Sequence, residues 1–210
     1  MKKIKKEYYF IAVLLICFIV LTLFVAFGKM DAFDERVFNA IIKSKNVPLT
    51  EFLRVITHLA STVGIITLTL VTGILFYRRK SLSDFKYVVL NVGTGVILME
   101  VIKNIIKRVR PAWKWIVQGG FSYPSGHTIS AFMLYGTLML LIYKKVHGRL
   151  RKPLLILSGL MIILTGLSRV YFGAHYLTDV LASLLLGTVV LIISNMFMNK
   201  EFKSDKNKGK

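Results

Sequence analysis

The chain has 210 residues, 55% of them hydrophobic, and a net charge of +19 from 29 basic and 10 acidic residues. Apolar runs as long as those in this sequence exclude an ordinary soluble domain. In a soluble protein such a charge would suggest a nucleic-acid partner. Here the basic residues gather in short segments between the apolar runs, so we expect no nucleic-acid partner.

Six apolar runs follow one another, each close to the roughly 20 residues that a helix needs to cross a membrane. They predict an all-α, polytopic membrane helical bundle that uses the whole chain, 1–210, as one domain. We interpret the first run as a retained membrane helix and not as a signal peptide, because it reaches Phe27 and no small-x-small cleavage site follows. The six predicted transmembrane helices are 8–28, 55–77, 85–102, 127–143, 153–168 and 176–198.

The basic residues also predict the orientation of these helices. With a cytoplasmic N-terminus, 18 of the 29 basic residues fall in the inner segments. The positive-inside rule therefore favours a multi-pass cell-membrane protein with both termini in the cytoplasm. The final segment, 199–210, is polar and rich in lysine, and we predict that it is a disordered basic tail.

The outer segment 29–54 carries mixed charge. Phe33, Val37 and Ile41 recur in it at helical spacing, which leaves two interpretations open: a short surface helix near 34–42, or a solvated loop. Glycines inside the predicted spans are interpreted as points of close helix contact. These are Gly64, Gly73, Gly93, Gly95, Gly159, Gly166 and Gly187.

His175 and Asp179 are four residues apart and share one face of a helix. A carboxylate in this position can accept the proton of one imidazole nitrogen and leave the other nitrogen free as a nucleophile. The alternative is a capping pair at the start of the sixth span. The pair alone does not decide between these interpretations.

The run Pro124-Ser125-Gly126-His127 opens the fourth span. Gly126 is expected to permit a tight turn, and the free amides at a helix start favour an anion. Ser125 is a natural N-cap whose hydroxyl could also donate to a substrate oxygen. A plain cap beside a lone histidine is the alternative.

Lys103, Arg110 and Arg169 are cations suited to phosphate, since arginine offers a planar fork and lysine a point charge. For the first two, the alternative is snorkelling at a span end, as we expect of Lys107 and Arg108. A metal site is disfavoured because the four histidines form no metal-ligand pattern and there is a single cysteine. We therefore expect no metal and no cofactor.

Together, Lys103-x6-Arg110-Pro111, Pro124-Ser125-Gly126-His127 and Ser168-Arg169-x5-His175-x3-Asp179 resemble the three signatures of the type 2 phosphatidic acid phosphatase superfamily. The resemblance implies that His175 is the nucleophile and that Asp179 orients it. It implies that His127 protonates the leaving oxygen and then activates water, without a metal. The implied phosphate-binding residues are Lys103, Arg110, Ser125, Gly126 and Arg169.

The expected function is hydrolysis of a lipid phosphate or diphosphate at the extracytoplasmic face through a phosphohistidine. The resemblance to bacterial members points to phosphatidylglycerol phosphate or undecaprenyl diphosphate as substrate. Two alternatives stay open: a non-catalytic lipid-phosphate binder, and a phosphotransferase that uses another acceptor. The expected partners are the lipid substrate and membrane lipid, and the oligomeric state is open.

Overall fold

The computed structural model describes residues 2–113, 115–116 and 118–208, with side chains from Lys6 to Phe197 outside those gaps. This part of the chain contains eight helices and no strand, which confirms the predicted all-α fold class. The helices are α1 (Lys2–Ala26), α2 (Asp31–Ile42), α3 (Val47–Leu59), α4 (Thr62–Arg78), α5 (Leu82–Ile106), α6 (Gly126–Lys145), α7 (Arg151–Tyr171) and α8 (Leu177–Lys208).

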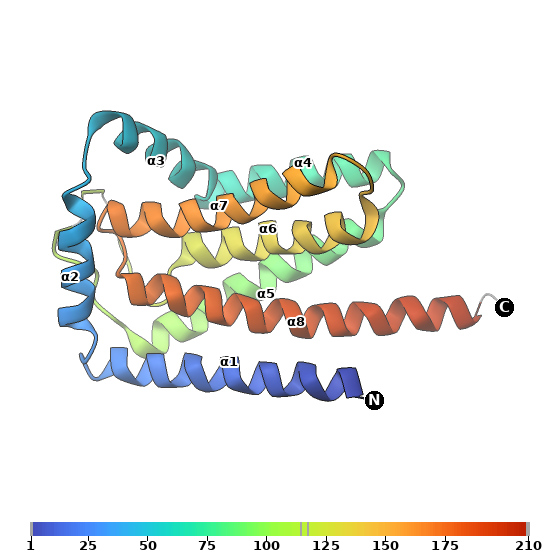
Figure 1. The fold of residues 1–210 in the computed structure, drawn as a ribbon, viewed down its shortest axis with the longest axis horizontal. Helices are drawn as coiled ribbons and strands as arrows, with labels where there is room; N and C mark the ends of the chain where they lie inside the picture. Colours follow the sequence, from blue (N-terminus) through green and yellow to red (C-terminus); the bar gives the residue numbers. More distant parts are fainter. Residues whose placement is uncertain (1, 114, 117, 209–210) are drawn as a thin grey trace.

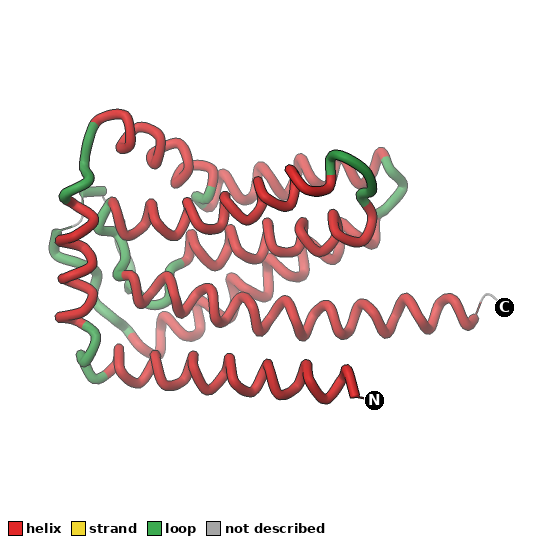
Figure 2. The backbone as a smooth tube through the Cα atoms, in the orientation of Figure 1, coloured by secondary structure: helices red, strands yellow, loops and turns green. Residues whose placement is uncertain are grey.

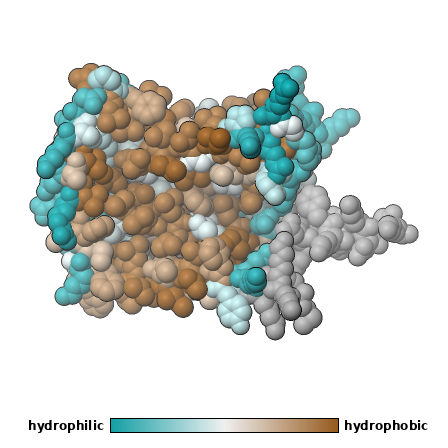
Figure 3. All heavy atoms as spheres, in the orientation of Figure 1, coloured by the Kyte–Doolittle hydropathy of each residue, from teal (hydrophilic) through white to brown (hydrophobic). Residues whose placement is uncertain are grey.

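Most of these helices run along one axis, and their connections gather at the two ends of the bundle (Figures 1 and 2). Five described helices are long and apolar enough to cross a membrane, and α3 with α4 makes a sixth, bent candidate. Hydrophobic side chains form a wide belt between two hydrophilic ends (Figure 3). The protein is therefore an integral membrane protein whose apolar surface faces lipid.

The second predicted span, 55–77, is wrong as a single helix. Two helices, α3 and α4, occupy this region and are bent by 61° at a short break. Ser61 caps α4, because its hydroxyl accepts a hydrogen bond from the Gly64 amide at 3.1 Å. A Cβ on Gly64 would lie 2.4 Å from the carbonyl oxygens of His58 and Leu59, so only glycine allows this close approach. The hydropathy of the run does not reveal the Ser61 cap or the close approach at Gly64, so it predicted one continuous helix.

A glycine in the left-handed region ends α1. Gly28 has a φ of +67°, and backbone hydrogen bonds from Gly28 and Lys29 return to the last turn of α1. The chain then forms α2, which lies across the end of the bundle (Figure 1). The helix interpretation of 34–42 is therefore correct, and Asp34 and Phe38 are the buried residues of α2.

The helix α8 is longer than predicted. It is described as far as Lys208, past the predicted span 176–198, and the disorder of 199–210 stays a prediction. Residues 188–208 contain neither proline nor glycine, and the polar part includes good helix formers such as lysine and glutamate. Nothing in this stretch stops the helix once it has left the apolar segment.

The helix α6 lies in the middle of the bundle and contacts α4, α5, α7 and α8. A Cβ on Gly95 would lie 2.4 Å from Met133, and one on Gly187 would lie 2.5 Å from Phe132. Glycine therefore allows close helix contact at these positions. The same interpretation is confirmed at Gly64, Gly73 and Gly166. It is wrong at Gly93 and Gly159, where nothing lies within 4 Å of a Cβ.

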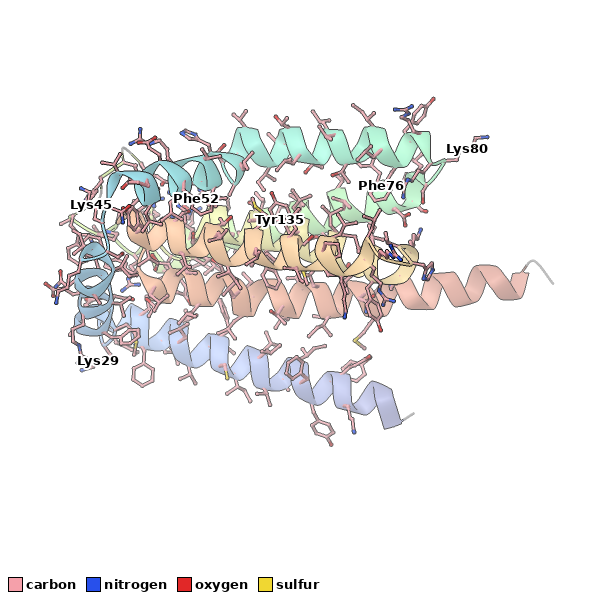
Figure 4. All side chains as sticks on the ribbon, turned by 45° about the horizontal axis from the view of Figure 1, so that its top comes forward. Lys29, Lys45, Phe52, Phe76, Lys80 and Tyr135 are labelled. Carbon is pink, nitrogen blue, oxygen red and sulfur yellow. The ribbon has the colours of Figure 1, made fainter. Side chains whose placement is uncertain are left out.

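The two ends of the bundle differ. The end of α5, the end of α7 and the starts of α6 and α8 meet at the end that α2 crosses, whereas α1 begins and α8 ends at the other (Figure 1). Lys29 and Lys45 lie at the α2 end, and Lys80 lies at the opposite end (Figure 4). This arrangement fits six crossings when the bent pair counts as one.

Candidate active site

All the residues singled out in the three motifs lie at the end of the bundle that α2 crosses. They come from the last turns of α5 and α7, the first turns of α6 and α8, and the connecting loops. Segments more than 60 residues apart in the chain meet here, as in the contact of Arg110 with His175. The eight residues are Lys103, Arg110, Ser125, Gly126, His127, Arg169, His175 and Asp179.

The buried imidazole of His175 is held at both ring nitrogens. Its Nδ1 lies 2.8 Å from the carbonyl oxygen of Ser122, and its Nε2 lies 3.0 Å from Nη1 of Arg110. A carbonyl oxygen can only accept a hydrogen bond and a guanidinium can only donate one. Nδ1 therefore carries the proton, and Nε2 presents its lone pair. This is the neutral tautomer in which Nε2 is the nucleophilic atom.

Both carboxylate oxygens of the buried Asp179 have partners. Oδ1 accepts a hydrogen bond from Nη1 of Arg108 at 2.8 Å. Oδ2 accepts from the Ser122 hydroxyl and from the Tyr176 amide, the latter at 3.0 Å. The same Oδ2 lies 3.4 Å from Nδ1 of His175. Asp179 thus lies on the Nδ1 side of His175, and the nearest acceptor of the Nδ1 proton is the Ser122 carbonyl oxygen.

Arg110 connects the loop after α5 with the loop before α8. Its Nε donates to the carbonyl oxygens of Gly119 and Gly120, both at 3.0 Å. Its Nη1 donates to the Ala174 carbonyl at 2.7 Å and to Nε2 of His175. Nη2 has no hydrogen bond to any residue that the structure describes. The guanidinium is therefore fixed in place beside the nucleophilic nitrogen and keeps donors available to an anion.

Arg169, at the end of α7, is almost completely buried. Nη1 donates to the Thr57 hydroxyl of α3 at 2.6 Å, and Nη2 donates to the side-chain oxygen of Gln118. Its Nε is buried and has no acceptor among the described residues. A buried charged donor without an acceptor costs free energy. An anion bound beside Arg169 would supply the missing acceptor.

The start of α6 faces Lys103. Ser125 is the predicted N-cap, since its hydroxyl accepts from the Thr128 amide at 3.4 Å. The tight turn predicted at Gly126 is wrong, because this residue is the first of α6 and its φ is not positive. The Lys103 ammonium lies close to this residue, since a Cβ on Gly126 would lie 3.7 Å from Nζ of Lys103 and in ordinary contact with Met99 at 3.4 Å. Helix amides and an ammonium group thus converge on one anion site.

His127 is the second residue of α6. Its ring makes no hydrogen bond within the part of the chain that the structure describes. The ionisable groups close enough to act on it electrostatically are Arg169, His175, Arg110 and Lys103. A second imidazole therefore lies beside His175 and the cations and remains free to exchange a proton.

Several residues of the site escaped the sequence analysis. Arg108 was expected to snorkel, but its side chain is only 8% exposed and binds Asp179 and Asp34. Ser122, Thr57 and the Gln118 side chain were not considered. The sequence contained one signal for these residues. Asp34 lies on the same helical face as the apolar Phe38, so an acidic side chain could be expected on a buried face, where it would need a partner such as Arg108. No motif spacing pointed to the others, because their partners are distant in the chain.

The environment shifts the pKa values of the loop residues in the site. Burial lowers the pKa of His175 to about 4, although Asp179 opposes this effect. Burial likewise lowers the pKa of Arg110, with Asp179 again opposing. For Arg108 burial acts in the same direction, but Asp179 and Asp34 outweigh it and raise the pKa. His175 is therefore a neutral imidazole at neutral pH, next to fixed cations.

Fold and site together define an integral membrane protein in which a neutral imidazole lies beside several fixed cations, an arrangement suited to an enzyme that transfers phosphoryl groups. Residues 85–203, more than half of the chain, match the family model of the PAP2 superfamily. The chain belongs to the PAP2 superfamily, as the three signatures predicted, and it is a lipid phosphate hydrolase.

Similar proteins support this assignment. The chain is 30% identical over 191 residues to the phosphatidylglycerophosphatase B of Bacillus subtilis (strain 168), covering 89% of this chain and 94% of the relative. The crystal structure of a transmembrane PAP2-type phosphatidylglycerolphosphate phosphatase from Bacillus subtilis matches with a TM-score of 0.83 and 29% identity, over 90% of this chain and 96% of that one. Aquifex aeolicus LpxE shares the fold, with a TM-score of 0.64 at 24% identity over 77% and 93% of the two chains.

Proposed function

We propose that this protein removes the phosphate head of a lipid at the extracytoplasmic face of the cell membrane, without a metal, through a phosphohistidine on His175. The observation that carries the proposal is the tautomer of His175. Nδ1 is protonated towards Ser122 and Asp179, and the Nε2 lone pair faces the Arg110 guanidinium. This arrangement supports a nucleophilic role, because the Nε2 lone pair is held beside a guanidinium that can also bind a phosphate oxygen.

In the first step Nε2 of His175 attacks phosphorus, and the bond from phosphorus to the lipid oxygen breaks. Nη1 of Arg110 donates to Nε2 before substrate binds. A phosphate oxygen competes for that N–H, so the arriving head group exposes the lone pair that attacks it. The imidazole becomes a cation when it is phosphorylated, and the Asp179 carboxylate, 3.4 Å from Nδ1, stabilises it.

The cations stabilise the charge on the equatorial phosphate oxygens. Nη2 of Arg110 and the buried Nε of Arg169 have no acceptor among the described residues, and Lys103 faces the start of α6. Phosphoryl transfer mainly requires positioning and electrostatic stabilisation of this kind. His127 gives its proton to the leaving lipid oxygen. It then takes a proton from the water that attacks the phosphohistidine, which releases inorganic phosphate and regenerates His175.

The distribution of basic residues supports an extracytoplasmic site. The end of the bundle opposite the site carries the basic segments on which the positive-inside argument rests, including the turn with Lys80 (Figure 4). The names of the Bacillus relatives favour phosphatidylglycerol phosphate as substrate over undecaprenyl diphosphate. The long apolar helices around the site offer a membrane environment for the lipid tail.

A substrate panel tests the proposed function. Purified protein in detergent with excess chelator should release phosphate from phosphatidylglycerol phosphate faster than from phosphatidate or undecaprenyl diphosphate. Complete loss of activity with chelator, restored by a divalent cation, would contradict the metal-independent mechanism. Tight lipid binding without turnover would identify a binder, and a phosphorylated alcohol among the products would identify a phosphotransferase.

The buried imidazole predicts an unusual pH dependence. Because the pKa of His175 is lowered to about 4, the nucleophile stays neutral through the range where a free imidazole, with a pKa near 6.5, would be protonated. We expect kcat/KM to fall on the acid side only as the pH drops through about 4, after correction for ionisation of the lipid phosphate measured by 31P NMR. A corrected acid limb near pH 6.5 would contradict this assignment.

A further inference from the structure

Arg108 connects Asp179, the partner of His175, to α2, although it belongs to none of the three motifs. Its Nη1 donates to Oδ1 of Asp179 at 2.8 Å and to the Thr178 hydroxyl at 2.7 Å. Its Nη2 donates to Oδ2 of Asp34 at 2.9 Å and to Oδ1 of Asp31 at 3.0 Å. Every N–H direction of the two terminal nitrogens thus has an acceptor, so neither Nη1 nor Nη2 is available to a substrate phosphate.

These contacts fix the orientation of the Asp179 carboxylate. Arg108 holds Oδ1, so that Oδ2 is turned towards His175 and the Ser122 hydroxyl. The guanidinium itself is held from a third side, because it stacks on the Tyr176 ring at 3.9 Å from the ring centre. Without Arg108, Asp179 would lose its charged partner and the constraint on its rotation.

Asp34 completes the arrangement from α2. Its Oδ1 accepts from the Thr178 amide at 3.1 Å, and its Oδ2 accepts from the Thr178 hydroxyl at 2.6 Å. It therefore caps the first turn of α8, the helix that carries Asp179, and also binds Arg108. One buried carboxylate from α2 thus positions both the helix start and the arginine.

The charges in this cluster match the reaction. The side chains of Asp34 and Asp179 are fully buried, with one guanidinium between them, so the buried cluster has one negative charge in excess. Backbone amides at the start of α8 stabilise this excess while the enzyme is free. When Nε2 of His175 is phosphorylated, its imidazole ring becomes cationic, and Asp179, 3.4 Å from Nδ1, then has a second cation beside it in addition to Arg108.

We propose that Arg108 is a positioning residue for the reaction, which acts through Asp179 and is itself held by Asp34. This proposal rests on the proposed function of His175 as the nucleophile. It assigns to α2 an indirect role in catalysis. Asp34 of α2 holds Arg108, and Arg108 holds the Asp179 carboxylate that stabilises the phosphorylated imidazole.

Kinetics of paired variants test this proposal. We expect Arg108→Met to lower kcat by about 100-fold with KM changed less than about threefold, as is typical for residues that orient a catalytic group. Arg108→Lys should recover about tenfold of that loss, because it restores the charge without the fork. Asp34→Asn should lower kcat by about tenfold. Arg54→Met, which removes an exposed arginine paired with Glu51 on α3, is the matched control and should be unchanged.

A double-mutant cycle with Asp179→Asn decides whether Arg108 acts through Asp179. In the Asp179→Asn background, Arg108→Met should cost less than about threefold in kcat. Equal losses in both backgrounds would overturn the proposal, as would a rise in KM at unchanged kcat, which would make Arg108 a substrate-binding group. If Arg108→Met does not fold, Arg108→Lys and Asp34→Asn decide alone, and wild-type kcat in both overturns the proposal.

The same assay separates this proposal from the function on which it rests. Wild-type protein that releases no lipid phosphate, or His175→Ala that keeps full activity, would refute the proposed function whatever Arg108 does. Active wild-type protein and inactive His175→Ala, together with unchanged Arg108 and Asp34 variants, would refute the positioning role alone.

Discussion

Replacing His175 with alanine is expected to lower the rate of lipid phosphate hydrolysis by about 10⁴-fold or more, because the variant has no atom to accept the phosphoryl group. Lys103, Arg110 and Arg169 remain in this variant, so substrate binding should change little. The measurement is phosphate release from phosphatidylglycerol phosphate in detergent at saturating substrate. The wild-type protein should also carry a labelled phosphoryl group in acid-sensitive linkage after rapid quenching, and the variant should carry none.

The control for this experiment is the folded state of the variant. His175→Ala removes contacts with Ser122 and Arg110, so its thermal unfolding in detergent should be compared with that of the wild-type protein. His58→Ala is a matched histidine substitution, because His58 lies at the exposed end of α3 and binds none of the motif residues through its ring. Full activity in a folded His175→Ala protein would remove His175 from the role of nucleophile.

Replacing His127 with alanine is expected to trap the phosphorylated enzyme. With a lipid analogue that carries a good leaving group, such as an aryl phosphate, the first step needs no proton from His127 and should proceed. The second step needs a base for water, so hydrolysis of the phosphohistidine should slow by about 10²–10⁴-fold, the usual size of general-base catalysis. A burst of one aryl leaving group per enzyme, followed by slow turnover, would be the result.

Two comparisons make the His127 experiment specific. With a natural lipid phosphate, whose alkoxide is a poor leaving group, His127→Ala should form the phosphoenzyme slowly as well, because the general acid is missing. The wild-type protein should show no accumulated phosphoenzyme with the aryl substrate if its second step is fast. A His127→Ala protein that turns over both substrates at the wild-type rate would show that another group exchanges the proton.

The two histidines differ in their surroundings, and this supports different roles. His175 is fixed at both ring nitrogens, so its tautomer and orientation are set before substrate arrives. The ring of His127 has no hydrogen bond to the described residues and lies beside the cations. A nucleophile benefits from fixed orientation. A general acid and base must exchange protons with two partners in succession, first the lipid oxygen and then water.

Much of the fold could be predicted because the signals are local. An apolar run of about 20 residues specifies a membrane helix wherever it lies, and five of the six predicted spans correspond to single helices. The prediction failed at 55–77, where a serine cap and the close packing of Gly64 break the helix. The helix α8 also runs past the predicted span 176–198, because polar composition does not by itself end a helix that has already formed.

The sequence by itself determined the class of enzyme, because the motifs contain the proposed nucleophile, the second imidazole and the cations in recognisable spacing. Only the tertiary structure decided what surrounds them. Arg110 and His175 are 65 residues apart and Arg108 and Asp34 are 74 apart, so no periodicity along the chain relates them. Hydrophobic runs and helical spacing are properties of neighbouring residues. The proton on Nδ1 and the orientation of Asp179 depend on contacts that exist only after the helices have packed.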